Sequence, residues 1–192
     1  GNDAEVTGVR DISWRADAPA TLVWAEAQDG GDPNRDAKVR DAVFMQAAPF
    51  DKPPVTLAQL GSRYAGITWG RGDLALLSES WWKTRNTKTW RIAPDDAAQS
   101  PQLLWDRDAQ DRYNDPGRAG VVRDVNGRSR LQTTADGRSI FLYGQGASPE
   151  GDRPFVDRFD IESRKATRLF HSQAPVYSSP VALLDQEGES LL

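Results

Sequence analysis

The sequence predicts an all-β fold, namely a partial β-propeller of about three four-stranded antiparallel blades plus the start of a fourth. Three observations lead to this prediction. The 192-residue chain is rich in turn-forming residues, with 16 Gly and 12 Pro. Short β-branched and aromatic runs alternate with these turns, and few stretches carry the apolar spacing of a helix. The runs recur in similar sets along the chain, as they do in repeat folds.

Each predicted set holds four short strands, except the last, which holds two. Apolar runs of four to eight residues between turn signals are typical of strands. The expected strands are residues 11–14, 21–25, 42–45 and 55–57; then 65–69, 74–78, 89–92 and 102–105; then 131–134, 139–143, 154–159 and 167–170; and finally 180–184 and 189–192.

A tight hairpin opens each set. The Asp136-Gly137 pair between two apolar runs is a strong hairpin signal, because such a turn needs residues that tolerate positive φ. The equivalent positions Trp14, Trp69, Thr133 and Leu183 lie 55, 64 and 50 residues apart. A four-stranded repeat of about 40–50 residues is typical of a propeller blade, and loop insertions explain the longer spacings.

These repeats predict blades over approximately 9–60, 63–108 and 119–172, with a partial blade over 177–192. A hairpin cut after its second strand would leave Leu191 and Leu192 at an open edge. We therefore expect the whole chain to be a fragment of a single propeller domain. An antiparallel sandwich with irregular hairpins is the alternative fold.

The composition excludes several classes of protein. Seven Trp, six Phe and four Tyr indicate a folded chain, because disordered chains are poor in aromatic residues. The net charge of -4 argues against a nucleic-acid partner. The sequence has no apolar run of membrane-spanning length, so no membrane partner is expected. Without Cys, and with His171 as the one histidine, Cys-based or His-rich metal sites are excluded.

Several segments of the repeats resemble the glutamyl endopeptidases of the prolyl oligopeptidase family. They are residues 13–17, 24–32, 78–85 and 144–151, the last followed by Pro154-Phe155. The resemblance runs in order from about Val9 to Leu184. It implies a two-domain serine peptidase, in which a propeller lies over an α/β-hydrolase domain that carries the Ser-Asp-His triad. The chain would be part of the propeller alone, with the catalytic domain absent.

The search for catalytic or cofactor motifs gives no site. No G-x-S-x-G nucleophile elbow is present, so no catalytic residue is assigned and the chain itself is expected to be inert. His171 follows a strand-like run and is interpreted as a strand residue. The G-x-G start at Gly144 has Pro149 at the third glycine position, so no dinucleotide cofactor is expected. The segment from Asp124 places Arg128 among would-be calcium ligands and is interpreted as an Asn-Gly turn.

A cluster of cations in the second set is the best candidate for substrate binding. Lys83, Arg85, Lys88 and Arg91 occur without an acid between Glu79 and Asp95. The cluster spans the connection between the second and third strands, and in a propeller all such connections lie on one rim. We expect this rim to face the catalytic domain, with Lys83 or Arg85 attracting an acidic peptide side chain.

The tryptophans divide into two groups. Trp14 and Trp69 occupy equivalent places before the first hairpin of their sets, which predicts a repeated packing role. Trp81 and Trp82 are adjacent, so they point to opposite faces of a strand and at least one must leave the core.

The function that these observations favour is the non-catalytic propeller part of a serine peptidase, a glutamyl endopeptidase, that gates and positions peptides. Its partners would be peptide substrate and the α/β-hydrolase domain, with self-association of the fragment through open blade edges. A periplasmic or secreted location is favoured over a cytoplasmic one. The alternative is a stand-alone propeller that binds a protein or peptide. A propeller lactonase or glycosidase would need axial metal ligands or acid pairs, which the sequence does not show.

Overall fold

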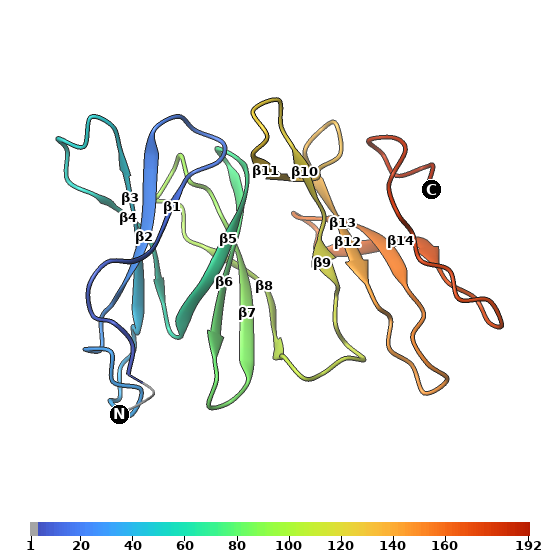
Figure 1. Ribbon diagram of the computed structural model, residues 1–192, viewed down its shortest axis with the longest axis horizontal. Coiled ribbons are helices and arrows are strands. Elements are labelled where there is room, and N and C mark those ends of the chain that lie inside the picture. Colours follow the sequence, from blue (N-terminus) through green and yellow to red (C-terminus); the bar gives the residue numbers. More distant parts are fainter. Residues whose placement is uncertain (1–3) are drawn as a thin grey trace. The chain divides into compact units, whose positions relative to one another are not determined.

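The computed structural model describes residues 4–192, and over these residues the chain is built from strands alone (Figure 1). No helix of the described part is long and apolar enough to cross a membrane. The chain divides into two compact units, one ending at Ala109 and the other spanning Gln110–Leu192. The strands of the first unit are β1 (Arg10–Trp14), β2 (Thr21–Ala27), β3 (Asp41–Ala47), β4 (Val55–Leu60), β5 (Arg63–Arg71), β6 (Leu74–Trp81), β7 (Asn86–Ile92) and β8 (Gln102–Asp108).

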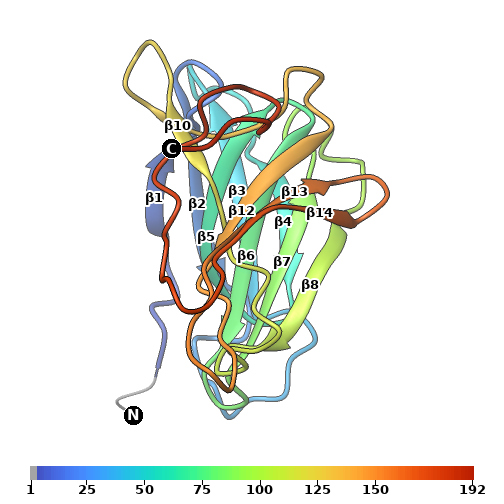
Figure 2. The same cartoon turned by 90° about the vertical axis from the view of Figure 1, so that its right-hand side faces the viewer.

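The first unit consists of two four-stranded antiparallel sheets. Their strand orders are β1-β2-β3-β4 and β5-β6-β7-β8, so each strand pairs with its neighbours in sequence (Figure 2). The turn before β2 closes with the Arg15 N–H donating to the Thr21 carbonyl at 2.8 Å. The hairpin between β5 and β6 closes at the pair Arg71 and Leu74. Both turns lie where the sequence predicts hairpins.

The two sheets of the first unit share one hydrophobic core. Val23 and Val43 of the first sheet and Ala75 and Leu77 of the second are fully buried, and Trp69 packs in the same cluster. Along β6 the side chains alternate between faces, so Leu77 points into this core and the buried Glu79 lies on the same face of the strand. Burial of apolar area between the sheets is the main force that holds this unit together.

The second unit contains one four-stranded antiparallel sheet and a separate two-stranded hairpin. Its sheet has the order β14-β13-β12-β9, and Ile140, Phe141 and Val156 are fully buried. A short bridge pairs Leu183 with Leu191, where the sequence predicts the first hairpin of a further set. The strands are β9 (Arg118–Ala119), β10 (Val121–Arg123), β11 (Ser129–Leu131), β12 (Ser139–Gly144), β13 (Phe155–Asp160) and β14 (Lys165–His171).

The innermost strand of this sheet differs from the prediction. Residues 131–134 were expected to fill that place, but β11 ends at Leu131 and pairs with β10, and only Thr133 bridges Ile140. The two-residue strand β9 pairs with Leu142 and Tyr143 instead. The hairpin β10–β11 is therefore an insertion that splits the first strand of the repeat in two.

All three large sheets have the four antiparallel strands of a propeller blade, and the described residues contain strands only. The predicted fold class, an all-β partial propeller made of such blades, is confirmed.

Candidate functional site

The turn between β6 and β7 carries both residues of the predicted substrate-binding pair. Lys83 extends from this turn to the long connection between β2 and β3, and its Nζ donates to the Asn34 Oδ1 at 2.6 Å and to the Pro33 carbonyl at 3.0 Å. The ammonium also lies 5.7 Å from the centre of the Trp82 ring. The long connection between β2 and β3 and the short turn between β6 and β7, which the sequence placed on one rim, therefore touch through Lys83.

Arg85 occupies the most constrained backbone position of this turn. Its φ of 55° lies in the left-handed region, which a non-glycine residue adopts at a conformational cost. The turn is closed by the Arg85 N–H, which donates to the Trp82 carbonyl at 3.3 Å, and the Arg85 carbonyl accepts from the Ala109 N–H at 2.7 Å. The end of β8 therefore holds the backbone from which the Arg85 side chain projects.

The other two cations of the predicted cluster do not join the turn. Lys88 lies on β7 and its Nζ is 3.7 Å from the carboxylate of Asp106 on β8. The Arg91 Nη1 donates to the Gln102 Oε1 at 3.2 Å, also across the β7–β8 pair. The structure therefore separates the cluster into two residues in the turn and two that bind the neighbouring strand.

The adjacent tryptophans at the end of β6 differ in exposure, but they do not point to opposite faces as strand alternation predicts, because Trp82 already lies in the turn and the two ring centres are 6.4 Å apart. Trp82 is 57% exposed on the turn. Trp81 is half-buried, and the Arg40 guanidinium carbon lies 4.1 Å from the centre of its ring. A guanidinium over an indole face is a favourable cation–π contact, so Trp81 anchors the turn while Trp82 faces outward.

An ionic network beneath the turn was not found from the sequence. Asp29 and Asp41 have no exposed side-chain surface, and Arg63 binds both carboxylates. Its Nη2 donates to the two oxygens of Asp29 at 2.9 and 2.8 Å, and its Nη1 donates to Asp41 at 2.9 Å. Arg40 adds a bond of 2.9 Å to Asp29, and Arg10 pairs with Asp41. The excess of Arg over Lys in the composition is the one feature of the sequence that points to such buried ion pairs.

The network stabilises the charged forms of Asp29 and Arg63. Burial by itself would raise the pKa of Asp29, but the hydrogen bonds and charge of Arg63, with the bond from Arg40, lower it overall. Burial by itself would likewise lower the pKa of Arg63, and the two aspartates raise it. Asp29 and Arg63 therefore form a buried ion pair at the base of the turn.

The pKa of buried Glu79 is raised, whereas that of Asp29 is lowered. Glu79 lies on β6 with 2% exposure, and burial raises its pKa above the usual value despite the nearby charge of Lys88. Its Oε2 has no hydrogen-bond partner within the described residues. Glu79 is a core residue of the first unit and does not reach the turn.

The remaining sequence candidates occupy structural positions. His171 is the exposed last residue of β14. The Asp124 segment forms a turn, in which the Asp124 carboxylate accepts the N–H groups of Asn126 and Arg128 at 2.8 and 2.9 Å. Trp69 is buried, but its repeat equivalent Trp14 is 60% exposed on the edge strand β1. Within residues 4–192 no group of three His, Cys, Asp or Glu side chains could hold a metal ion.

Together these contacts describe a small basic turn on a rigid base, suited to binding an anion and without a nucleophile or a general base. Lys83 has only neutral oxygens as partners, and no carboxylate lies within ion-pair distance of it in the described part of the chain. Its positive charge is therefore not neutralised locally. A carboxylate that approached the turn would be attracted by it.

Comparison with known proteins gives relatives of one kind. No protein-family model matches the chain. The chain is 42% identical over 189 residues to the "Probable glutamyl endopeptidase, chloroplastic" of Arabidopsis thaliana, covering 95% of the chain and 20% of that protein. It is 41% identical over 191 residues to the protein of the same name from Oryza sativa subsp. japonica, again covering 20% of it. The chain thus spans about a fifth of the length of the curated relatives that it matches.

Among solved structures, the β-propeller domain of the Trilobed protease from Pyrococcus furiosus covers 91% of this chain, with a TM-score of 0.44 and 10% sequence identity; the match covers 45% of that chain. The sequence relatives support the resemblance. Over the fifth of their length that it spans, this chain is similar to proteins named as glutamyl endopeptidases, which confirms the resemblance predicted from its motifs.

Proposed function

We propose that this chain is the non-catalytic propeller part of a serine peptidase, a glutamyl endopeptidase, and that it gates and positions peptide substrates. The observation that carries the proposal is 42% identity over 95% of the chain to a protein named as such an enzyme. The absence of a nucleophile elbow supports a non-catalytic role for this chain. The partners in the intact protein are then an α/β-hydrolase domain and the peptide, in a compartment outside the cytosol.

Lys83 and Arg85 are the residues proposed to favour acidic peptides. Lys83 is held by uncharged oxygens, and Arg85 projects from a turn that β8 holds in place. A guanidinium can bind a carboxylate through two parallel hydrogen bonds, and a nearby ammonium adds attraction without a fixed geometry. The turn would thus guide a glutamate side chain before the peptide reaches the catalytic domain.

Removal of the two charges tests this role in the intact protein. The variants are Lys83→Gln and Arg85→Asn, the second because Asn tolerates the left-handed backbone of that position. Loss of one charge-assisted hydrogen bond should lower kcat/KM by roughly tenfold for a Glu-containing peptide. The same peptide with Gln in place of Glu should be cleaved at an unchanged rate.

Arg71→Gln is the matched control, because Arg71 is the last residue of β5, next to the turn to β6, and pairs with Asp73. It should change neither rate. Equal losses for the Glu and Gln peptides, or no loss for either variant, would contradict the role of Lys83 and Arg85.

A further inference from the structure

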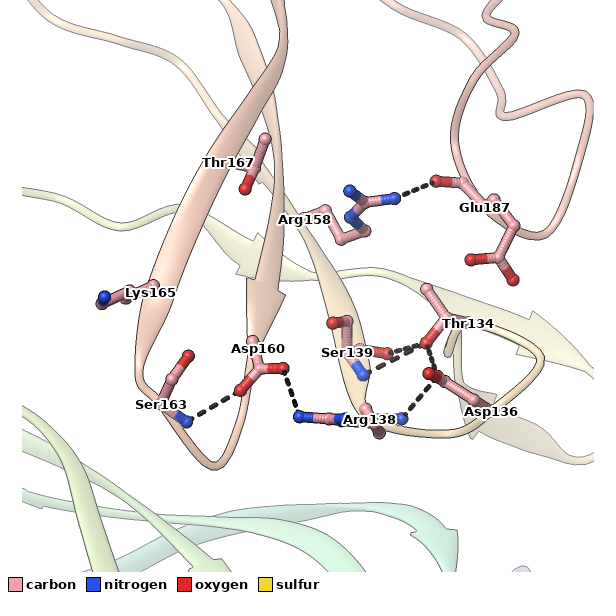
Figure 3. Close-up of a pocket in the computed structure, with 10 residues that line it drawn as sticks. All are labelled: Thr134, Asp136, Arg138, Ser139, Arg158, Asp160, Ser163, Lys165, Thr167 and Glu187. Carbon is pink, nitrogen blue, oxygen red and sulfur yellow. Dashed lines mark hydrogen bonds and ion pairs between the residues drawn. The ribbon is translucent and has the colours of Figure 1, made fainter.

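The second unit contains a polar pocket that has no part in the function proposed above. Its volume is about 350 Å³, which is within the usual range for pockets that hold small molecules. Its walls come from the turn before β12, from the ends of β13 and β14, and from the segment around Glu187 (Figure 3). The lining is almost entirely charged or hydroxylated, so an apolar ligand would gain little there.

The three carboxylates of the pocket are already used to hold turns. Each accepts a backbone N–H, and this bond is the largest cause that lowers the pKa of Asp136 and of Asp160. Because these carboxylates are already hydrogen-bonded to the backbone, they shape the walls and are poor candidates for ligand contacts. The bonds run from the Arg138 N–H to Asp136 at 3.0 Å, from the Ser163 N–H to Asp160 at 2.7 Å, and from the Ala135 N–H to Glu187 at 3.1 Å.

Two cations of the pocket make no close ion pair with any described residue, although the charge of Arg158 is one of the causes that lower the pKa of Asp136. The Arg158 Nη1 donates to the backbone carbonyl of Glu187 at 3.2 Å, and its guanidinium lies between Thr167 and Glu187 in Figure 3. Lys165, at the start of β14, also lines the pocket. In the part of the chain that the structure describes, neither side chain has a carboxylate within ion-pair distance. The remaining N–H groups of Arg158 can therefore donate to a ligand.

Two hydroxyl groups complete the set of available donors and acceptors. The Ser139 Oγ and the Thr167 Oγ1 line the pocket, and neither makes a hydrogen bond with another described residue. A hydroxyl can both donate and accept. These groups are suited to the polar atoms that surround a carboxylate on a small molecule.

We propose that this pocket binds a carboxylate carried by a small polar molecule. The Arg158 guanidinium binds the carboxylate oxygens, Lys165 adds positive charge, and the hydroxyls of Ser139 and Thr167 bind neighbouring polar atoms of the ligand. The carboxylate can belong to a free hydroxy acid or to an acidic peptide. The site is independent of Lys83 and Arg85.

Calorimetric titration of the intact protein with two matched pairs of probes tests the proposal. The first pair is D-gluconate and D-glucose, and the second is N-acetyl-Ala-Glu-Ala-amide and its Gln counterpart. In at least one of the two pairs, the probe with the carboxylate should bind, and its neutral counterpart should bind at least tenfold more weakly. Affinity should also fall as salt rises, because part of it is electrostatic. Binding in the gluconate pair alone identifies a hydroxy acid, and binding in the peptide pair alone identifies an acidic peptide.

Variants assign the binding to the pocket. Arg158→Gln should weaken binding of the carboxylate probe at least tenfold. Arg158→Lys should weaken this binding less, because lysine keeps the positive charge although it loses the planar guanidinium group. Arg112→Gln is the matched control, since Arg112 pairs with Asp152 on the same unit outside the pocket lining. If Arg158→Gln fails to fold, the loss of carboxylate affinity in Arg158→Lys serves as the test of the pocket. No binding of either carboxylate, or equal binding by the wild type and the Arg158 variants, overturns the proposal.

Discussion

At the scale of single residues, Arg63 decides how the first unit is held together. Burying an ion is costly unless it is paired and hydrogen-bonded, and Arg63 pairs two fully buried carboxylates, Asp29 and Asp41. Asp29 lies after β2 and Arg63 begins β5, so the contact ties a loop of the first sheet to the second sheet. Removal of one partner should therefore cost far more than removal of a surface pair.

The Asp29→Asn variant measures this cost. It leaves Arg63 and Arg40 with one negative charge too few, and the free energy of unfolding should fall by about 3–5 kcal/mol. Urea denaturation followed by tryptophan fluorescence gives the value. Asp152→Asn, which removes a solvent-exposed pair with Arg112, is the control and should cost about 1 kcal/mol or less. Similar losses in the two variants would show that the network contributes no more than a surface pair.

The same carboxylate predicts a dependence of stability on pH. The pKa of Asp29 is lowered in the folded state, so the unfolded chain takes up a proton first as pH falls. Its contribution is complete above the unfolded pKa of about 3.9 and is lost as pH falls through the folded value. The stability difference between wild type and Asp29→Asn should be constant from pH 7 to 5 and shrink below pH 4. A difference that stays constant down to pH 3 would contradict this.

Sequence reasoning proposed Lys83 and Arg85 as candidates because an acid-free run of cations is visible in a short window. It could not reach the Asp29–Arg63 contact, since the two residues are 34 positions apart and their meeting depends on how two sheets pack. Nothing in the sequence shows that Lys88 and Arg91 would turn to β8, because that choice follows from strand register.

At the scale of elements, the repeat pattern located most strands, and the exception is informative. The predicted strand at 131–134 is reduced to a bridge between Thr133 and Ile140, because the chain reaches the edge of the sheet earlier, through β9, and then leaves it in the hairpin β10–β11. Both β9 and the segment 131–134 are short and partly polar, so the spacing of apolar residues does not show which of them forms the edge strand. In the structure β9 is that strand, because it pairs with Leu142 and Tyr143.

Gly117 sets the entry into β9 and offers a test of this arrangement. Its φ is +88°, and a Cβ there would lie 2.7 Å from the backbone carbonyl of Tyr143. Gly117→Ala should therefore separate β9 from β12, in addition to about 1–2 kcal/mol of conformational strain. Faster hydrogen exchange at the Gly120 amide, which donates to the Phe141 carbonyl at 2.8 Å, would report the change.

The control for Gly117 is Gly127→Ala in the β10–β11 hairpin. Its φ of +74° is also left-handed, but a Cβ there would meet nothing within 4 Å. This variant should show the conformational strain alone and leave the Gly120 amide protected. Equal protection of Gly120 in both variants would mean that β9 does not depend on Gly117.

At the scale of the whole molecule, the open edge of the first sheet predicts self-association of this chain. β1 has a sheet neighbour on one side, and Ile12 and Trp14 on it are 62% and 60% exposed. An unpaired edge with apolar side chains is a template for pairing with another chain. Light scattering after size exclusion should show species larger than 21.2 kDa, in proportions that grow with concentration.

Lysine on an edge strand opposes such pairing, so Trp14→Lys should shift the chain toward the monomer. Val125→Lys is the control, because Val125 is fully exposed at the tip of the β10–β11 hairpin. A wild-type chain that stays monomeric at every concentration would refute the prediction.

The two carboxylates that share Arg63 restrict the substitutions that evolution can accept one at a time. A change of Arg63 alone leaves Asp29 and Asp41 with one guanidinium partner each, and a change of Asp29 or Asp41 alone leaves surplus positive charge. A replacement by apolar residues avoids both penalties only if it includes Arg10 and Arg40 as well. Lineages that descend from a common ancestor should therefore inherit the five residues of the network as a unit.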